Sequence, residues 1–185
     1  MQDRQNSDYE FRSNTTYSYR LLRPTMRNVL VTGGNQGIGY ALCKQLAIEH
    51  NCHVYLTARN AERGQEAASN IRKLGGSIDF IPLDTTSEKS IQNAAKLTRE
   101  KLSENFLYGI VNNAGIGLNT GSGDVIKTNL YGPKLVCENF LPLLDAGKGR
   151  VVNVGSGSGP MYVGSVRSKA DARMLCSPDN EDMTW

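Results

Sequence analysis

Several features are scarce in this 185-residue sequence, and each scarcity argues against a class of protein. The four cysteines are scattered and form no CxxC pair, which favours a reducing, cytoplasmic setting over secretion. No apolar run approaches the length needed to cross a bilayer, so we expect no membrane partner. A net charge of +3 is too small to indicate a nucleic-acid partner.

Histidine is rarer still, with two residues in the chain. His50 and His53 lie close to Cys52, a grouping that could suggest a metal site. These residues straddle an expected helix-to-strand turn, and no further cluster of ligand-type residues accompanies them. We therefore expect no metal site.

The first 25 residues also lack a pattern that could build a core. The segment from Met1 to Thr25 is polar, of mixed charge, and has no apolar stretch of the kind found in signal peptides. We expect residues 1–25 to be a disordered leader. Met26 precedes the first expected strand and could be the natural start of the protein.

The most informative stretch of the chain is Val29 to Gly39, with the sequence VLVTGGNQGIG. Three apolar residues run into a glycine-rich turn, and an amphipathic run follows at once. A strand, a glycine turn and a helix in this order are typical of a dinucleotide-binding crossover, in which the helix N-terminus faces the phosphates. The alternative is a glycine-rich turn without a ligand.

Strand-like and helix-like segments alternate through the rest of the chain. Strands are expected at 28–32, 53–57, 78–83, 107–111 and 150–154. Helices are expected at 37–50, at 61–74, from a cap at Ser87 to about Leu102, and at 125–144, with irregularities at Pro133 and Pro142. This alternation predicts an α/β fold, a doubly wound parallel sheet of the Rossmann type. The expected domain covers residues 26–159, followed by an irregular tail at 160–185.

In such sheets, ligands bind at the carboxyl ends of the strands. Arg59 follows the second expected strand, about twenty residues after the glycine turn, where an acidic residue would bind the ribose 2'-hydroxyl of NAD. An arginine at this place accommodates the 2'-phosphate of NADP instead, because a guanidinium pairs well with phosphate. The alternative for Arg59 is an exposed surface arginine. We expect NADP(H) as the cofactor.

The glycine spacing is G-x-x-x-G-x-G, led by Thr32, and in this form it resembles the short-chain dehydrogenase/reductase family. The resemblance continues through NNAG at 112–115, KTNLYG at 127–132 and VVNVGSGSG at 151–159. The segments TGGNQGIG, LTARN and LPLLDAGKGRVVNV resemble sequences of the carbonyl reductase branch, whose members reduce ketones and aldehydes with NADPH. Many NADP-preferring relatives have a basic residue where this chain has Gln36.

The resemblance implies a role for each matching residue. Asp84 would bind the adenine amino group, Asn129 would interrupt a helix and help position a water, and Ser156 would hydrogen-bond the substrate carbonyl. Asp84 could instead be a turn aspartate, and Ser156 an ordinary loop serine. The residues expected to bind the cofactor are Thr32, Gly33, Asn35, Gln36, Gly37, Ile38, Gly39, Arg59, Asp84, Asn113, Ala114 and Gly115. Those expected to be catalytic are Asn129 and Ser156.

The family's general acid, a tyrosine followed four positions later by a lysine, has no match after Ser156. The one tyrosine there is Tyr162, the residue four positions on is Val166, and Lys169 comes later. We therefore expect a chain that is truncated at its carboxyl end and inactive, with the sheet incomplete at that edge and its last strand exposed. Three readings stay open: the amino-terminal part of an NADPH-dependent carbonyl reductase, a non-catalytic NADP(H)-binding isoform, or a non-functional fragment. The substrate and the oligomeric state are left open.

Overall fold

The computed structural model describes residues 26–117 and 120–176. Its centre is a five-stranded parallel sheet with the strand order β3-β2-β1-β4-β5, which confirms the predicted fold class. The strands are Arg27–Val31 (β1), Cys52–Ala58 (β2), Ile78–Pro82 (β3), Leu107–Asn112 (β4) and Arg150–Asn153 (β5). Each predicted strand is present, with its bounds within two residues of the prediction. The predicted leader at 1–25 lies outside the described residues.

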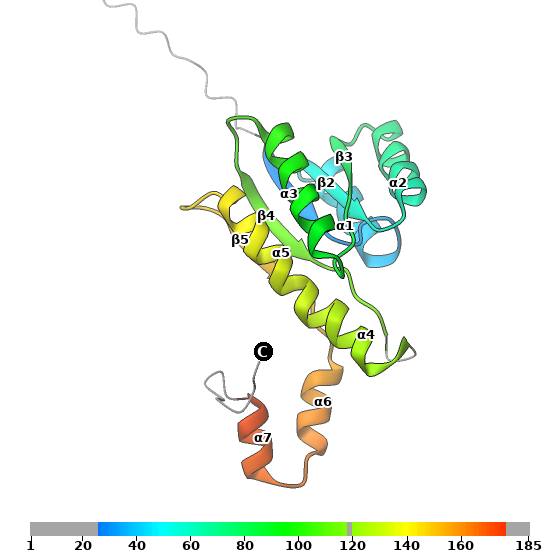
Figure 1. Cartoon of the computed structure of the whole chain (residues 1–185). Helices are drawn as coiled ribbons and strands as arrows, with labels where there is room; N and C mark the ends of the chain where they lie inside the picture. The colour runs from blue at the N-terminus through cyan, green and yellow to red at the C-terminus, as the bar shows by residue number, and fades with distance from the viewer. Residues whose placement is uncertain (1–25, 118–119, 177–185) are drawn as a thin grey trace, which may run out of the picture.

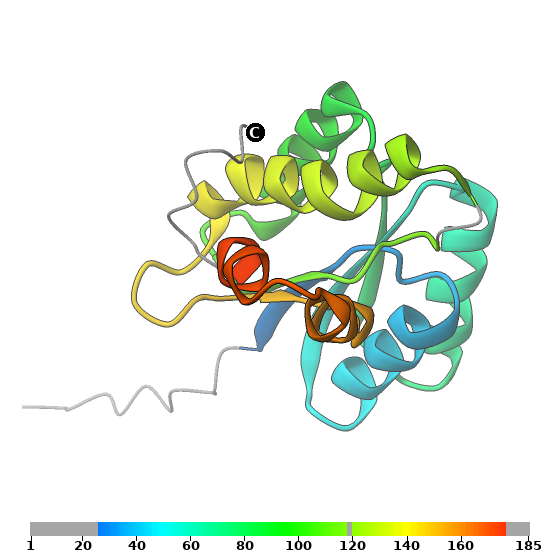
Figure 2. The same ribbon diagram turned by 90° about the horizontal axis from the view of Figure 1, so that it is seen from below.

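Helices cover both faces of the sheet (Figures 1 and 2). On one face α1 (Gly37–Ile48) and α2 (Ala61–Lys73) pack over Val31, Val54 and Leu56. On the other face α3 (Glu88–Leu102) and α5 (Gly132–Phe140) pack over Leu30 and Ile110. Since adjacent strand residues alternate between the two faces, β1 contributes to both cores, as expected for a strand buried on both sides.

Local signals explain where the helices begin. The Ser87 side chain accepts a hydrogen bond from the Ser90 N–H, so the predicted cap of α3 is present. The Asn60 side chain caps α2 in the same way, by accepting from the Arg63 N–H at 2.8 Å. The sequence analysis had not assigned this second cap. Both caps stand after strand ends and direct the chain back along the sheet.

The long helical stretch predicted at 125–144 is divided into four pieces. It consists of α4 (Ser122–Ile126), the π-helical turn η2 (Lys127–Tyr131), α5, and the 3₁₀ turn η3 (Leu141–Leu143). The predicted irregularities at Pro133 and Pro142 are confirmed, because one follows the π-helical turn and the other lies in the 3₁₀ turn. Helix α4 begins at Ser122, three residues before the predicted start of this stretch; residues 118 and 119 lie outside the described part.

The prediction of an irregular tail is wrong for residues 160–176. This part forms helices α6 (Ser158–Ser165) and α7 (Lys169–Cys176), which contact each other and project from the carboxyl end of the sheet (Figure 1). Pro160 is accommodated because it stands in the first turn of α6, where its missing N–H is not needed. The Ser168 hydroxyl accepts from the Asp171 N–H and supports the start of α7.

Strand β5 forms one edge of the sheet and pairs with β4 alone in the described structure. All four of its residues are exposed; Val152 is 49% exposed, and Val154, which follows the strand, is 47% exposed. The expectation of an exposed, apolar last strand is confirmed for this chain. This edge carries unpaired backbone groups beside apolar side chains, which is the usual template for association with another chain.

Candidate functional site

A groove of about 390 Å³ crosses the carboxyl ends of the central strands. It lies where the glycine turn after β1, the loop after β2 and the loop after β4 come together, so residues from distant parts of the sequence share one wall. Of the residues expected to bind the cofactor, all except Thr32 line it: Gly33, Asn35, Gln36, Gly37, Ile38, Gly39, Arg59, Asp84, Asn113, Ala114 and Gly115. The fold therefore gathers the predicted cofactor residues in one place.

The glycine turn brings the start of α1 close to the groove. A Cβ atom on Gly39 would lie 2.3 Å from the Gly33 carbonyl oxygen and 2.5 Å from the Asn113 side-chain nitrogen, so only glycine fits there. Helix α1 has no side-chain cap and no acidic residue in its first turn. Its N-terminal N–H groups are therefore available to an anion, which the positive end of the helix dipole also attracts.

Thr32 lies beneath the groove rather than on its wall. It is 1% exposed, and its Oγ1 accepts hydrogen bonds from the Asn113 and Ala114 N–H groups, both at 3.0 Å. The Asn113 side chain donates back to the carbonyl oxygens of Thr32 and Gly33 at 3.0 and 3.3 Å. Thr32 thus positions the Asn113–Ala114 turn against the glycine turn.

Two arginines line the groove and a neighbouring cavity, together with the acidic residues Asp84 and Glu66. Arg59 lies at the end of β2, is exposed, and lines the groove together with Gln36. A smaller cavity of about 350 Å³ shares Asn35 and Gln36 with it and is lined by Arg63, the third residue of α2. The sequence analysis missed Arg63, although its spacing of four residues from Arg59 beside a helix start was a usable signal.

Asp84 forms a turn at the end of β3 and also reaches the groove. Its Oδ1 accepts from the Thr86 N–H at 2.9 Å and from the Thr86 hydroxyl at 2.7 Å, so it is a turn aspartate. It also lines the groove. The Ser90 hydroxyl accepts from the Asp84 N–H at 2.9 Å and ties this strand end to α3.

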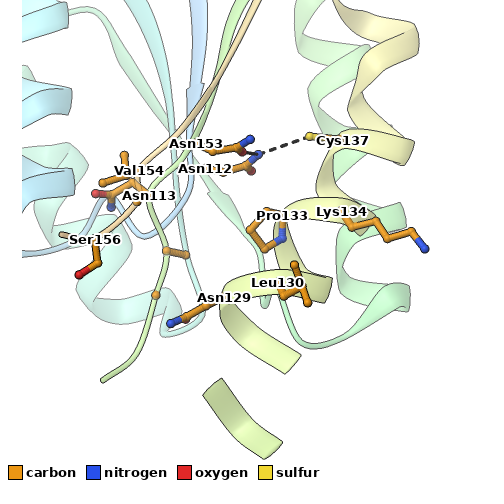
Figure 3. A pocket seen from close by; sticks show the side chains of 13 residues that line it. Asn112, Asn113, Asn129, Leu130, Pro133, Lys134, Cys137, Asn153, Val154 and Ser156 are labelled. Carbon is orange, nitrogen blue, oxygen red and sulfur yellow. Dashed lines mark hydrogen bonds between the residues drawn. The ribbon is translucent and has the colours of Figure 1, made fainter. Parts of the chain in front are cut away.

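A second cavity, of about 740 Å³, adjoins the groove through Asn113, Ala114 and Gly115. Figure 3 shows its two sides: Val154 and Ser156 come from the end of β5, and Leu130, Pro133 and Lys134 come from η2 and α5. Both expected catalytic residues, Asn129 and Ser156, line this cavity. It is therefore the place where the structure brings the end of the groove, Asn129 and Ser156 together.

Asn129 lies in the π-helical turn η2, and its side chain is held by the loop after β4. Its Oδ1 accepts from the Ile116 N–H and its Nδ2 donates to the Ile116 carbonyl, both at 2.9 Å. The Gly132 N–H donates to the Lys127 carbonyl, five residues back, and Pro133 has no N–H to offer. The backbone carbonyl of Asn129 thus lacks its regular α-helical donor.

Ser156 follows β5 and is exposed at the cavity wall (Figure 3). Its Oγ lies 3.1 Å from the Ser158 hydroxyl and accepts from the Ser158 N–H at 3.2 Å. Tyr162 and Lys169, the remaining candidates for an acid pair, stand on different helices, α6 and α7. Neither lines the cavity that contains Ser156.

The histidine and cysteine grouping near residue 52 has a structural explanation. His53 Nδ1 lies 2.8 Å from the Ser77 hydroxyl, and its Nε2 lies 3.7 Å from an Asp79 carboxylate oxygen. Cys52 is buried in the core on the other face of β2. The described residues contain no group of three or more metal-ligating side chains. Among the described helices, none has the length and apolarity needed to span a membrane.

Comparisons with known proteins assign this arrangement to a family. Residues 27–170 match the model of the short chain dehydrogenase family. The chain is 36% identical to (+)-neomenthol dehydrogenase of Arabidopsis thaliana over 168 residues, which is 74% of this chain and 56% of that protein. It is 37% identical to carbonyl reductase [NADPH] 1 of Homo sapiens over 158 residues, 81% of this chain and 52% of that one.

The fold comparison gives the same result. The crystal structure of NADPH-bound carbonyl reductase from chicken fatty liver superposes with a TM-score of 0.61 at 30% identity, over 72% of this chain and 58% of that one. The chain spans about half the length of the curated relatives it matches. The matched part contains both cavities, with every residue that lines the groove.

Proposed function

This chain belongs to the short-chain dehydrogenase family, and we propose that it binds NADP(H) in the groove at the strand ends. The residues present fit that cofactor. An uncapped helix start without an acidic residue suits the pyrophosphate, and the glycine turn lets the chain approach it closely. Ile38, which is 74% exposed at the groove, would be covered by a bound dinucleotide.

The preference for NADP(H) over NAD(H) rests on Arg59, with Arg63 as a second cation. Arg59 stands at the end of β2, where an acidic side chain would repel a 2'-phosphate and a guanidinium would bind it. Arg63 borders the neighbouring cavity on the far side of Gln36. Arg59 and Arg63 each line a cavity that includes Gln36, and Arg59 would supply most of the positive charge that Gln36 does not, because Glu66 also lines the cavity of Arg63. Asp84 would then contact the adenine end.

We further propose that the parent enzyme is an oxidoreductase that reduces the carbonyl group of a small ketone or aldehyde. Bound NADPH supplies the hydride for this reaction. In this chain, Ser156 would orient the carbonyl oxygen, because Ser156 lines the cavity that continues from the groove. Asn129 would hold the loop after β4 through its two bonds to Ile116 and so fix the floor between groove and cavity.

The 185-residue chain itself contains no Tyr-x-x-x-Lys sequence after Ser156. Among the described residues, no tyrosine lines the cavity that contains Ser156, so the family's proton donor to a reduced carbonyl oxygen has no counterpart there. We therefore propose that this chain binds NADP(H) without appreciable reductase activity. The function that we propose for this chain is therefore cofactor binding without catalysis. A cytoplasmic location is part of the same proposal, supported by the free thiols of Cys43, Cys52 and Cys137.

The decisive experiment is a calorimetric titration of the 185-residue chain with NADPH and, separately, with NADH. Saturable binding of NADPH, at least tenfold tighter than that of NADH, is the expected result. A parallel assay with a model aromatic ketone should show no oxidation of NADPH above the buffer rate. Failure to bind either cofactor would leave the non-functional reading standing. Ketone reduction by this chain would overturn the proposal of a non-catalytic role.

A further inference from the structure

A serine, a histidine and an aspartate meet at the amino ends of β2 and β3, at the opposite end of the sheet from the groove. His53 is the second residue of β2, and Ser77 directly precedes β3. Tyr55 pairs with Asp79 across the two strands, and the Ser77 carbonyl accepts from the Val54 N–H at 3.0 Å. Because alternate residues along a strand share a face, Ser77 and Asp79 lie on the same side of the sheet as His53 and Tyr55.

The imidazole of His53 lies between the serine and the carboxylate. Its Nδ1 is 2.8 Å from the Ser77 hydroxyl oxygen, and its Nε2 is 3.7 Å from an Asp79 carboxylate oxygen. Lys101 Nζ donates to the same carboxylate oxygen at 2.9 Å and holds it in place. A negative charge on the Nε2 side favours the tautomer with its hydrogen on Nε2. Nδ1 is then the acceptor, and the Ser77 hydroxyl donates to it, which is the pairing of nucleophile and base that covalent catalysis uses.

His53 is in the uncharged state at neutral pH that a base requires. Burial lowers its pKa most strongly; Asp79 raises it, and Lys101 and Arg72 lower it further. The Tyr55 ring packs edge-on against the imidazole with the ring centroids 4.8 Å apart, and it stays neutral because burial raises the pKa of Tyr55 to about 12. The side chains of His53 and Asp79 are nevertheless 24% and 33% exposed, so small solutes can reach the imidazole.

We propose that Ser77 is a reactive serine that activated esters of short carboxylic acids acylate, with His53 as its general base. The Ser77 oxygen attacks the ester carbonyl carbon, and its proton passes to His53 Nδ1. The bond between that carbon and the leaving oxygen or sulfur breaks, and His53 gives the proton to the leaving group, which departs as an alcohol, a phenol or a thiol. The product is an ester on Ser77. This site does not depend on the NADP(H) binding proposed above.

The test is acetylation of the 185-residue chain by p-nitrophenyl acetate, with the acetyl groups mapped and their rates of appearance measured by mass spectrometry. We expect Ser77 to be the serine that is acetylated fastest. Ser165 is the internal control, because it is exposed and its hydroxyl donates at 2.7 Å to the Tyr162 carbonyl, which is too weak a base to take the proton. Acetylation of Ser77 no faster than that of Ser165 would overturn the proposal.

Two variants separate the serine from the imidazole. His53→Gln removes the base, and acetylation of Ser77 should slow about a hundredfold, the lower end of what general-base catalysis contributes; an unchanged rate contradicts the role of His53. Ser77→Ala keeps the base, and release of p-nitrophenolate should slow as it does in His53→Gln. If Ser77→Ala releases p-nitrophenolate at the parent rate, the imidazole itself is the nucleophile and the proposal is wrong. Urea midpoints show whether the variants are folded; if His53→Gln is not, Ser77→Ala and the acetylation map of the parent chain decide.

Asp79 is a positioning residue in this proposal, because it acts through His53 rather than on the ester. Asp79→Asn removes the charge that raises the pKa of His53 and favours its Nε2–H tautomer. Acetylation of Ser77 should therefore become slower, and the midpoint of its pH dependence, which follows the deprotonation of His53, should move to lower pH. A structural role alone would leave this midpoint where it is, and an unchanged midpoint contradicts the role given to Asp79.

Discussion

Thr32 and Asn113 lie 81 positions apart in the chain and hold each other by two hydrogen bonds. The Thr32 Oγ1 accepts from the Asn113 N–H, and the Asn113 amide donates to the Thr32 carbonyl, both at 3.0 Å. Because Thr32 follows β1 and Asn113 follows β4, this pair joins two loops at the centre of the groove. The Thr32 hydroxyl and the Asn113 amide therefore both contribute to the relative position of the two loops.

Replacing Thr32 by valine keeps the side-chain shape and removes that hydroxyl. The part-buried Ala114 N–H would lose its acceptor, and the Asn113 N–H would keep only the Val111 carbonyl at 3.1 Å, so we expect the free energy of unfolding to fall by about 2 kcal/mol. Urea denaturation of the two proteins measures this difference. Thr32→Ser keeps the oxygen and should remain within about 1 kcal/mol of the parent chain. Equal stability of the valine and serine variants would contradict the assigned role.

The strands, the helices and the dinucleotide-binding layout could be predicted because their signals are local. Val29–Val31 with the following glycines, and the Ser87 cap of α3, are readable within a few residues. The Thr32–Asn113 pairing carries no such signal, since it depends on β1 and β4 becoming neighbours. The burial of Thr32 beneath the groove follows from that tertiary arrangement and was not predictable from its position in the motif.

The tail shows a different limit of the sequence. An irregular tail was predicted at 160–185, yet α6 runs to Ser165 and α7 begins after the Ser168 cap, so Gly164 and Ser165 stand at a boundary between two helices. Likewise, the sequence identifies Asn112 only as part of the NNAG motif at a strand end. Its bonds to Asn153 and Cys137 arise only when β5 and α5 pack around β4.

The cofactor preference can be tested by removing the two cations one at a time. For Arg59→Ala, we expect the affinity for NADPH to fall about tenfold to a hundredfold, because a charge-assisted hydrogen bond to phosphate is lost. For Arg63→Ala a smaller loss is expected, and the affinity for NADH should change in neither variant. Fluorescence titration with both cofactors measures these values.

The matched control for those variants is Arg173→Ala, which removes an exposed arginine from α7, away from the groove. Its affinity for NADPH should equal that of the parent chain. A loss of similar size in all three variants would show that net charge, rather than a phosphate site beside Gln36, governs binding. An equal loss for NADPH and NADH in Arg59→Ala would argue against recognition of the 2'-phosphate.

His53 should make stability dependent on pH. Burial lowers its pKa most strongly; nearby Asp79 raises it, while Lys101 and Arg72 lower it further. Because the folded pKa lies below the unfolded value near 6.5, the unfolded chain takes up a proton first as pH falls. The stabilising contribution is complete above about pH 6.5 and is lost as pH drops through the folded pKa.

The measurement is the urea midpoint of the parent chain and of His53→Gln at several pH values between 7.5 and 5. The difference between the two proteins should shrink as pH falls, and the glutamine variant should show the shallower dependence. Parallel curves over this range would show that other groups carry the acid sensitivity. Ser77, at 2.8 Å from His53 Nδ1, provides a further check, because Ser77→Ala removes that bond without removing the titrating group.

The exposed edge at β5 should make the isolated chain associate with itself. Val152 faces the same side of the sheet as its buried neighbour Val111 and is 49% exposed. A lysine there places a charge against an incoming strand, which is how natural sheets protect their edges, so Val152→Lys should shift the chain toward the monomer. Ile126→Lys is the control, since Ile126 is equally exposed at 49% but lies on α4.

Sedimentation velocity of the three proteins at equal concentration measures the effect. A parent chain that sediments as a compact, stable monomer would overturn the prediction, and an equal gain from both lysines would assign the association to general surface hydrophobicity.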